Sequence, residues 1–396
     1  MKTMFTISTL SALIAGVSGQ AMAVDYTLYK TPNSQFEEAY ANGSLNYADG
    51  GAQPQAAYDV KLNANYLNRQ STEFQSRQFA IDAAGSTSRD SADGADAVTS
   101  SNLGLSGSVD NYINGDPQGL FWSAGAGARF QNLATGTEQS QYDVNLGLGY
   151  GRIYDATPLA RAVKLGKELS TKGVINAMPS DNVLMDIAHV VAREDEYRSK
   201  YSTVSDNTAE SYRAKMLADV EAVLAQAGVL SNGLGAAGTI YANEVLFEMA
   251  VNARAHGFVV RAGAAYTGSK IGDLSNDEPA LKFDAEYAKP LGETGQFTNT
   301  FSFVPAETTK RASNTMRYTT EVTDNTEWQN QWLVDYQDND GIQTTSHTLS
   351  SDYVVRLSNR LSYSAGVQFN QTSGDGIGDE GDLATRVTMG LNYRIK

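Results

Sequence analysis

The chain ends in a segment whose two faces differ in polarity. From Arg386 to Ile395 apolar residues occupy every second position. The residues that would share one face of a β-strand are Val387, Met389, Leu391, Tyr393 and Ile395. The other face carries polar residues and one glycine, Gly390. A strand with one apolar and one hydrated face suits a barrel wall that has lipid outside and water inside.

The same alternation recurs upstream from about residue 37. Clear examples are residues 58–66, 142–150 and 361–369, where apolar and polar residues change places at every step. We count about six such segments before residue 153 and about eight after residue 257. The sequence therefore predicts an all-β transmembrane antiparallel barrel of about 14 strands. Short turns are expected at one rim and longer loops, such as 88–99, 269–277 and 371–382, at the other.

Residues 157 to about 256 break this pattern and repeat at helical spacing. Thr157 followed by Pro158 begins a first helix, Ser180 can cap a second, and a third is expected at about 208–227. Residues 241–255 fit a strand or a helix equally well. An extra strand would make the count odd and leave the two halves of the barrel in conflict, so we predict a fourth helix. The helices carry enough apolar residues to form a core of their own, as an α-helical periplasmic domain.

The N-terminus indicates export. Lys2 precedes a short apolar stretch and the sequence Ala21-Met-Ala23, which predicts a signal peptide over 1–23. The expected organisation is then a lead-in at 24–36, a first barrel part at 37–153, a helical insertion at 154–256 and a second barrel part at 257–396. The chain has no cysteine, which excludes disulfides and thiolate chemistry, and its net charge of −15 argues against a nucleic-acid partner.

The pattern Thr388-x-Gly390-x-x-Tyr393-x-Ile395 resembles the C-terminal β-signal of Gram-negative outer-membrane β-barrel proteins. The resemblance is to this class and not to one family. It implies an outer-membrane location, a wall in contact with lipid and lipopolysaccharide, and recognition of these four residues by the barrel-assembly machinery. A periplasmic partner is expected for the helical insertion.

Ionisable residues at inward positions are the candidate functional residues. The pore-lining candidates are Asp59, Lys61, Arg129, Asp143, Lys282, Asp284, Glu286, Asp335, Arg386 and Arg394. They could pair with each other and plug the interior, or line a water-filled pore and steer solutes. The leading prediction, from a water-filled pore, is a porin-like channel for passive diffusion of small polar or ionic solutes. The alternative function is a barrel-anchored structural or interaction protein whose helical domain binds a periplasmic partner or the cell wall.

Catalysis and cofactor binding have little support. His189, His256 and His347 lack an accompanying nucleophile or acid motif, so no catalytic residue is assigned. The Gly-rich stretch Gly147–Gly151 is not followed by Lys-Ser/Thr and does not predict a phosphate loop. The acidic loop at 375–382 lacks the spacing of an EF-hand. We therefore expect neither an enzyme nor a metal site or cofactor.

Overall fold

The computed structural model describes residues 24–31, 33–48, 55–132, 138–201, 210–230, 232–249, 251–271, 274–339, 341–358, 360–375 and 383–394. In these ranges 14 antiparallel strands form a closed barrel, in which each strand pairs with its neighbours in the chain and β1 pairs with β14. The predicted fold class and strand number are confirmed. The expected signal peptide, Ile395 and most of the 375–382 loop lie outside the described residues.

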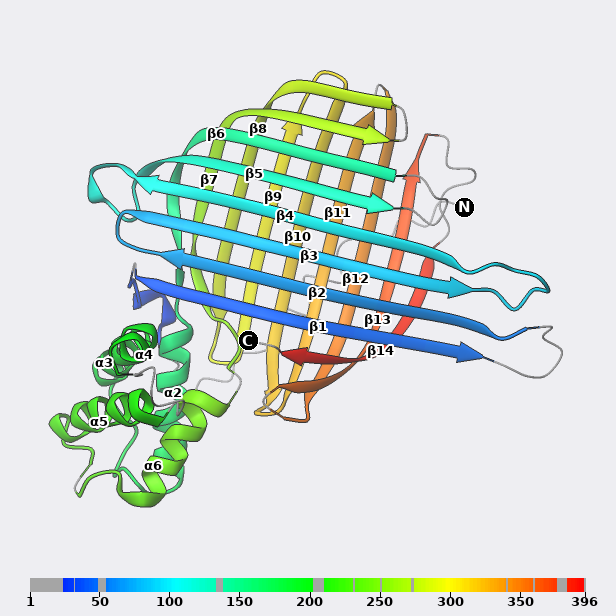
Figure 1. Cartoon of the computed structure of the whole chain (residues 1–396). Helices are drawn as coiled ribbons and strands as arrows, with labels where there is room; N and C mark the ends of the chain where they lie inside the picture. The colour runs from blue at the N-terminus through cyan, green and yellow to red at the C-terminus, as the bar shows by residue number, and fades with distance from the viewer. Residues whose placement is uncertain are drawn as a thin grey trace, which may run out of the picture.

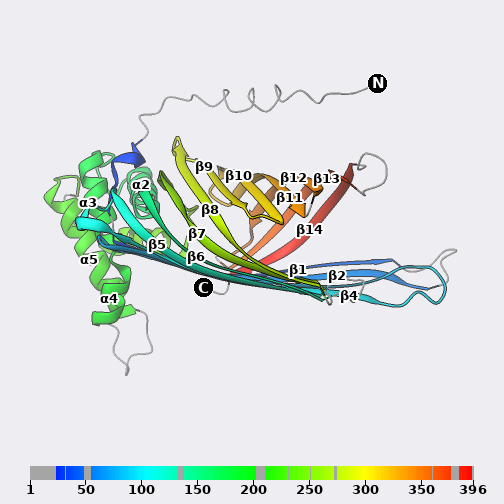
Figure 2. The same cartoon turned by 90° about the horizontal axis from the view of Figure 1, so that it is seen from above.

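The strands fall into two groups on either side of the helical insertion (Figure 1). The first group is β1 (Ser34–Ala48), β2 (Ala57–Ser71), β3 (Gln75–Arg89), β4 (Val98–Tyr112), β5 (Leu120–Asn132) and β6 (Glu138–Asp155). The second group is β7 (Ala255–Ile271), β8 (Leu274–Leu291), β9 (Gly295–Pro305), β10 (Thr309–Thr323), β11 (Thr326–Asn339), β12 (Ile342–Arg356), β13 (Leu361–Gly374) and β14 (Ala384–Arg394). Seen from above, β1 to β8 form a long wall and β9 to β14 a shorter one (Figure 2).

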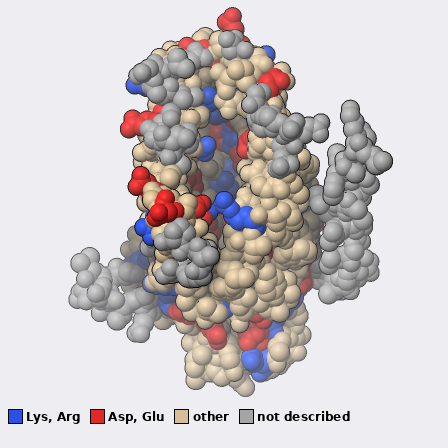
Figure 3. Space-filling view, turned by 90° about the vertical axis from the view of Figure 1, so that its right-hand side faces the viewer, with Lys and Arg blue, Asp and Glu red and all other residues tan. Residues whose placement is uncertain are grey.

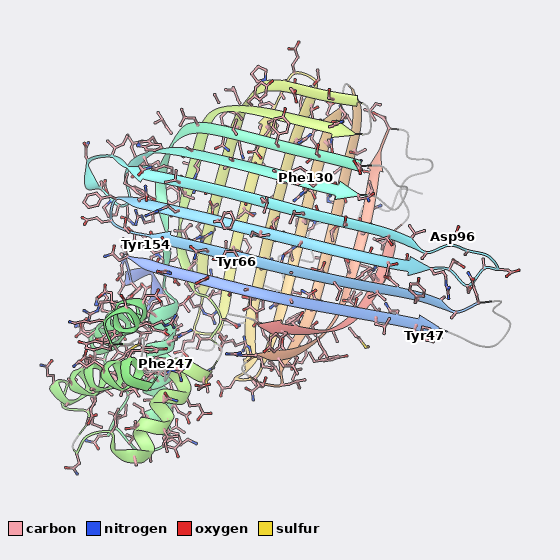
Figure 4. All side chains as sticks on the ribbon, in the orientation of Figure 1. Tyr47, Tyr66, Asp96, Phe130, Tyr154 and Phe247 are labelled. Atoms are coloured by element: carbon pink, nitrogen blue, oxygen red, sulfur yellow. The ribbon has the colours of Figure 1, made fainter. Side chains whose placement is uncertain are left out.

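The outer face of the wall is apolar because alternate residues of each strand point outward. Leu146 is 63% exposed, Leu148 62% and Val387 69%, values far from those of a packed core. Figure 4 labels two aromatic residues of this wall, Tyr66 on β2 and Phe130 on β5. Large apolar side chains left exposed at every second position are expected where hydrocarbon, not water, is the solvent. Closure satisfies the backbone hydrogen bonds that such a solvent cannot.

The connections differ in part from the expected pattern. We call the rim that carries the helices the helical rim and the other the far rim. The predicted long loop at 269–277 is wrong, because β7 and β8 extend until only residues 272–273 separate them. The far-rim connections at 306–308 and 340–341 are also short. The strands are longer than the nine to eleven residues expected of a transmembrane strand, so they include residues that were predicted to be loop.

The helical insertion lies between β6 and β7, beyond the helical rim (Figure 1). Its helices are α2 (Thr157–Thr171), α3 (Asp181–Val191), α4 (Glu194–Tyr201), α5 (Glu210–Gln226) and α6 (Gly235–Asn243), followed by the π-helical turn η4 (Glu244–Glu248). Helix α4 was not predicted. The helix predicted over 241–255 is wrong in its bounds, because α6 begins at Gly235 and the described residues between η4 and β7, 249 and 251–254, are not helical. None of the described helices has the length and apolar character needed to cross a bilayer.

The insertion has a hydrophobic core of its own. Leu159 of α2, Leu184 of α3, Met216 of α5 and Leu246 of η4 are each fully buried in it. The N-terminal segment joins this core through Tyr26 and Tyr29, which are 4% and 1% exposed. The helices therefore form a packed unit and do not fill the barrel.

Polar contacts fix this unit to the helical rim. Arg254, only 1% exposed, lies 3.1 Å from a carboxylate oxygen of Glu321 at the end of β10. Lys164 of α2 lies 3.1 Å from Asp324 in the β10–β11 turn. His256 Nε2 lies 2.8 Å from the carbonyl oxygen of Tyr29, which connects the N-terminal segment to β7. The insertion is thus held in a defined place against the barrel.

Candidate functional site in the barrel lumen

A cavity of about 410 Å³ lies inside the barrel, lined by residues of β2 to β10. Figure 3, which views the far rim, shows an elongated hollow with basic and acidic side chains in and around it. The lining alternates with the outer apolar positions, as the two faces of each strand require. Ionisable side chains of the lining include Asp110, Asp143, Arg261, Lys282, Asp284 and Glu286.

The main charged cluster centres on Arg261 of β7. Its Nη2 lies 2.7 Å from Asp110 Oδ2 on β4, and its Nε also donates to that carboxylate. Its Nη1 donates to Glu286 Oε1 on β8 at 2.6 Å. Asp110 is only 4% exposed. One guanidinium between two carboxylates links strands that are distant in the sequence and leaves a formal charge of −1.

A second, wetter pair lies beside this cluster. Lys282 Nζ lies 3.2 Å from Asp143 Oδ2 across the β6–β8 side of the cavity, and the Asn145 side-chain amide donates to the same oxygen at 3.3 Å. Asp284 also lines the cavity and faces Arg261 across the β7–β8 register. Among the described residues Asp284 has no ion pair within 4.0 Å. With Arg69 and Arg152, the cavity lining holds four acidic and four basic side chains, so its formal net charge is zero.

Aromatic residues pack the wall toward the helical rim. Phe121 is fully buried and its ring centroid lies 5.1 Å from that of Tyr112. The Arg152 guanidinium lies 4.0 Å from the centroid of Tyr112 and donates to the carbonyl of Thr72 at 2.7 Å. Gly149 leaves the space that the Phe121 ring occupies, since a Cβ there would overlap the ring. This packing fills the interior beside β4, β5 and β6 with side chains.

The structure brings together four of the ten predicted lining residues: Asp143, Lys282, Asp284 and Glu286. Asp59 and Lys61 lie elsewhere on the inner face of β2 and form a pair at 3.0 Å. Arg129, Asp335 and Arg386 are exposed residues on the inner faces of β5, β11 and β14, outside this cavity. Arg394 pairs through its backbone with Tyr40, and its side chain is not among those described.

Sequence analysis missed Asp110, Arg152 and Arg261. Arg261 could have been found from the sequence. It lies between Val260 and Ala262 in a predicted strand, and because these two apolar residues face outward, Arg261 must face the lumen. The three histidines have structural neighbours: His189 lies beside Tyr29, His256 stacks on Tyr154, and His347 lies beside Trp332. Among the described residues no group of three or more His, Cys, Asp or Glu is placed to hold a metal ion.

No family model matches the chain, and no curated protein matches it. Solved structures similar to it include an anion-selective porin from Comamonas acidovorans, at 10% identity over 91% of this chain and 99% of that one, with a TM-score of 0.32. The Pseudomonas aeruginosa OprD structure matches at 10% identity over 95% and 99%, with a TM-score of 0.30. The CymD monoaromatic hydrocarbon channel matches at 10% identity over 93% and 90%, with a TM-score of 0.28. These likenesses are distant, and the interpretation of the barrel rests on its own geometry.

Proposed function

We propose that the chain is an outer-membrane channel through which small polar or ionic solutes diffuse passively. The observation that carries this proposal is a charge-lined cavity inside a closed barrel whose outer face is apolar. A barrel of this strand number is wider than the eight-stranded kind whose interior side chains fill. The β-signal resemblance supports the outer membrane as its location, and the helical insertion would then lie in the periplasm.

The lining suggests how solutes would be steered. The Arg261 cluster and the Lys282–Asp143 pair hold opposite charges a few ångströms apart, which creates a strong local field with little net charge. Asp284 adds acid to the same cavity. Such a lining would let hydrated ions and small polar molecules pass, and its equal numbers of acidic and basic side chains give no net preference for cations or anions.

Conductance tests this proposal. Purified protein in a planar lipid bilayer is expected to give stepwise single-channel currents. The variant Ser106→Trp places a large ring at the cavity lining and should lower the unit conductance. Its matched control is Leu105→Trp, the neighbouring position on the same strand, which faces outward and should leave conductance unchanged. A folded barrel that gives no current, or equal effects of the two variants, would refute the channel.

A second function is supported by the helical insertion. A unit with its own core, attached to the rim by buried contacts such as Arg254–Glu321, is a suitable platform for binding cell wall or a periplasmic protein. In that case the barrel is an anchor. Co-sedimentation of the intact protein with purified cell wall, together with electrical silence, would favour this function over the channel.

A further inference from the structure

The barrel closes through an unusually short seam. Among the described residues β1 pairs with β14 only at Tyr40–Arg394, Ala41–Tyr393, Asn42–Asn392 and Gly43–Leu391. On its other side β14 pairs with β13 at every position from Ala384 to Tyr393. Toward the far rim β1 and β14 are therefore unpaired beyond Gly43, and the other break in the described wall is at β8, whose residues 274–282 have no β9 partner.

The strands diverge although both are described at that level. Continuing the register would place Ser44 opposite Gly390, Asn46 opposite Thr388 and Tyr47 opposite Val387, yet these residues are not paired. Figures 1 and 2 show the outer part of β1 running away from the outer part of β14. Figure 4 labels Tyr47 near the end of β1 that lies away from the helical domain.

Glycine marks the point of divergence on both strands. Gly43 ends the paired stretch and Gly390 lies one position beyond it. Glycine weakens a strand because it brings no side chain to pack against the neighbouring strand. We call the opening between residues 44–48 of β1 and residues 384–390 of β14 the lateral wedge.

The two faces of the lateral wedge differ in polarity. Its outer side carries Leu45, Tyr47, Val387 and Met389, each more than 60% exposed. Its inner side carries Ser44, Asn46, Arg386 and Thr388. An open strand edge is not tolerated in hydrocarbon unless it borders a hydrated space. We therefore expect the unpaired edges to border the lumen, with polar side chains on that side and apolar side chains on the other.

We propose that the barrel opens sideways at the lateral wedge and admits an anionic amphiphile, with its head group toward the lumen and its apolar tail in the membrane. The sign follows from sequence, because Arg386 is the one charged residue in 44–48 and 384–390. A carboxylate or phosphate head group would accept charge-assisted hydrogen bonds from this guanidinium. The inference deepens the proposed channel function by adding a membrane-side entrance to the lumen.

Cysteine cross-linking tests the opening, and the cysteine-free chain makes each introduced pair unique. The variant Asn42→Cys/Asn392→Cys joins residues that are opposite each other in the paired seam and should form a disulfide quickly under mild oxidation in lipid vesicles. The variant Asn46→Cys/Thr388→Cys joins inward residues that would be opposite only if the register continued. It should react at least about tenfold more slowly, because a disulfide needs Cα atoms within about 7 Å.

A quenching experiment tests the ligand. A fluorophore attached at Asn46→Cys in phosphatidylcholine vesicles should be quenched by a nitroxide-labelled stearate, and less by the same chain with a trimethylammonium head group. Adding Arg386→Gln should weaken the apparent stearate affinity by about threefold to tenfold. The matched control is Arg129→Gln, an exposed inward arginine on β5 away from the lateral wedge, which should leave that affinity unchanged.

Each contrary result is distinct. Equal cross-linking rates for the two cysteine pairs would show that β1 and β14 also pair beyond Gly43. Intermolecular disulfides from Thr388→Cys alone would show that a second copy covers the edge. Equal quenching by both head groups would overturn the anionic ligand. Either cross-linking result would refute the lateral opening, and equal quenching would refute the ligand, while stepwise conductance persisted. Loss of conductance alone would refute only the channel.

Discussion

At the scale of single residues, Gly149 shows how a missing side chain on one strand decides which side chain can pack on the next. Its missing side chain leaves room for Phe121, which is fully buried against Tyr112. We predict that Gly149→Ala destabilises the barrel by about 1–3 kcal/mol, because the added methyl group forces the ring from its place. Urea unfolding of protein refolded in detergent micelles or vesicles would measure this loss.

The control for Gly149→Ala is Gly85→Ala, where an added Cβ would meet nothing within 4 Å. That variant should cost far less. A smaller side chain in the double variant Gly149→Ala/Phe121→Leu should recover part of the loss, so the two changes should not be additive. Equal losses in Gly149→Ala and Gly85→Ala would show that the Phe121 contact is not the cause.

Lumen charge should determine ion preference. Lys282→Gln leaves Asp143 without its cation, and we predict a rise in the cation-to-anion permeability ratio. Asp284→Asn removes an acid that has no ion pair among the described residues and should lower the ratio. Effects on the order of twofold are expected for single lining charges. Reversal potentials in a salt gradient would measure both variants, and shifts of the same sign would contradict the assignment.

Residue parity could predict which side chains face the lumen but not which ones meet. Lys282 and Asp143 were both predicted to face inward. Their ion pair depends on the order and register of β6, β7 and β8, which the sequence of a single strand does not reveal. Phe121 shows the limit of the approach. It is an aromatic residue on the inner face, where polar residues are expected, and its burial depends on Gly149 on the next strand.

At the scale of elements, α4 and α5 meet through a polar contact outside the membrane. The Tyr197 hydroxyl donates to Asp219 Oδ2 at 2.5 Å, and Lys215 Nζ lies 3.0 Å from Oδ1. The Tyr197 hydrogen bond, with help from Lys215, lowers the pKa of Asp219 below its ordinary 3.8. A lowered folded-state pKa gives stability that is present above the unfolded value and lost as pH falls through the folded value.

We therefore predict that Asp219→Asn lowers the thermal midpoint of the helices at pH 7 and has a smaller effect once the pH is well below 3.8. Circular dichroism at 222 nm of the intact protein would report the helices. Asp181→Asn, in the first turn of α3, is a control carboxylate away from this contact. A difference between wild type and Asp219→Asn that stays constant with pH would contradict the argument.

Elements with one dominant periodicity were predicted well, and those without one were not. Helix α4 lacks an apolar stripe: only Tyr197 is buried, and the Glu194–Arg198 pair at 2.8 Å supports it. Residues 241–255 fit two periodicities because they change conformation midway. There the Met249 amide donates to the carbonyl of Glu244, which forms a π-helical turn that neither pattern describes.

At the scale of the whole molecule, the helical insertion is a separate unit placed into one hairpin. Strands β6 and β7 pair without interruption until Asp155 lies opposite Ala255. The barrel hairpin is therefore complete before the chain leaves for α2. The need for an even number of strands predicted this arrangement. The burial of Tyr26 and Tyr29 in the helical core was not predicted, because it joins segments that are far apart in the sequence.

The last prediction follows from that hairpin. Replacing residues 156–254 by Asn-Gly, a two-residue turn that suits antiparallel strands, should give a barrel that still assembles and conducts. The deletion removes the Arg254–Glu321 contact and uncovers Tyr26 and Tyr29, so a modest loss of stability is expected. Heat-dependent gel mobility would report assembly, and single-channel recording would report the pore. A barrel that no longer forms would show that the helices are needed to build the wall, and a larger unit conductance would show that they restrict it.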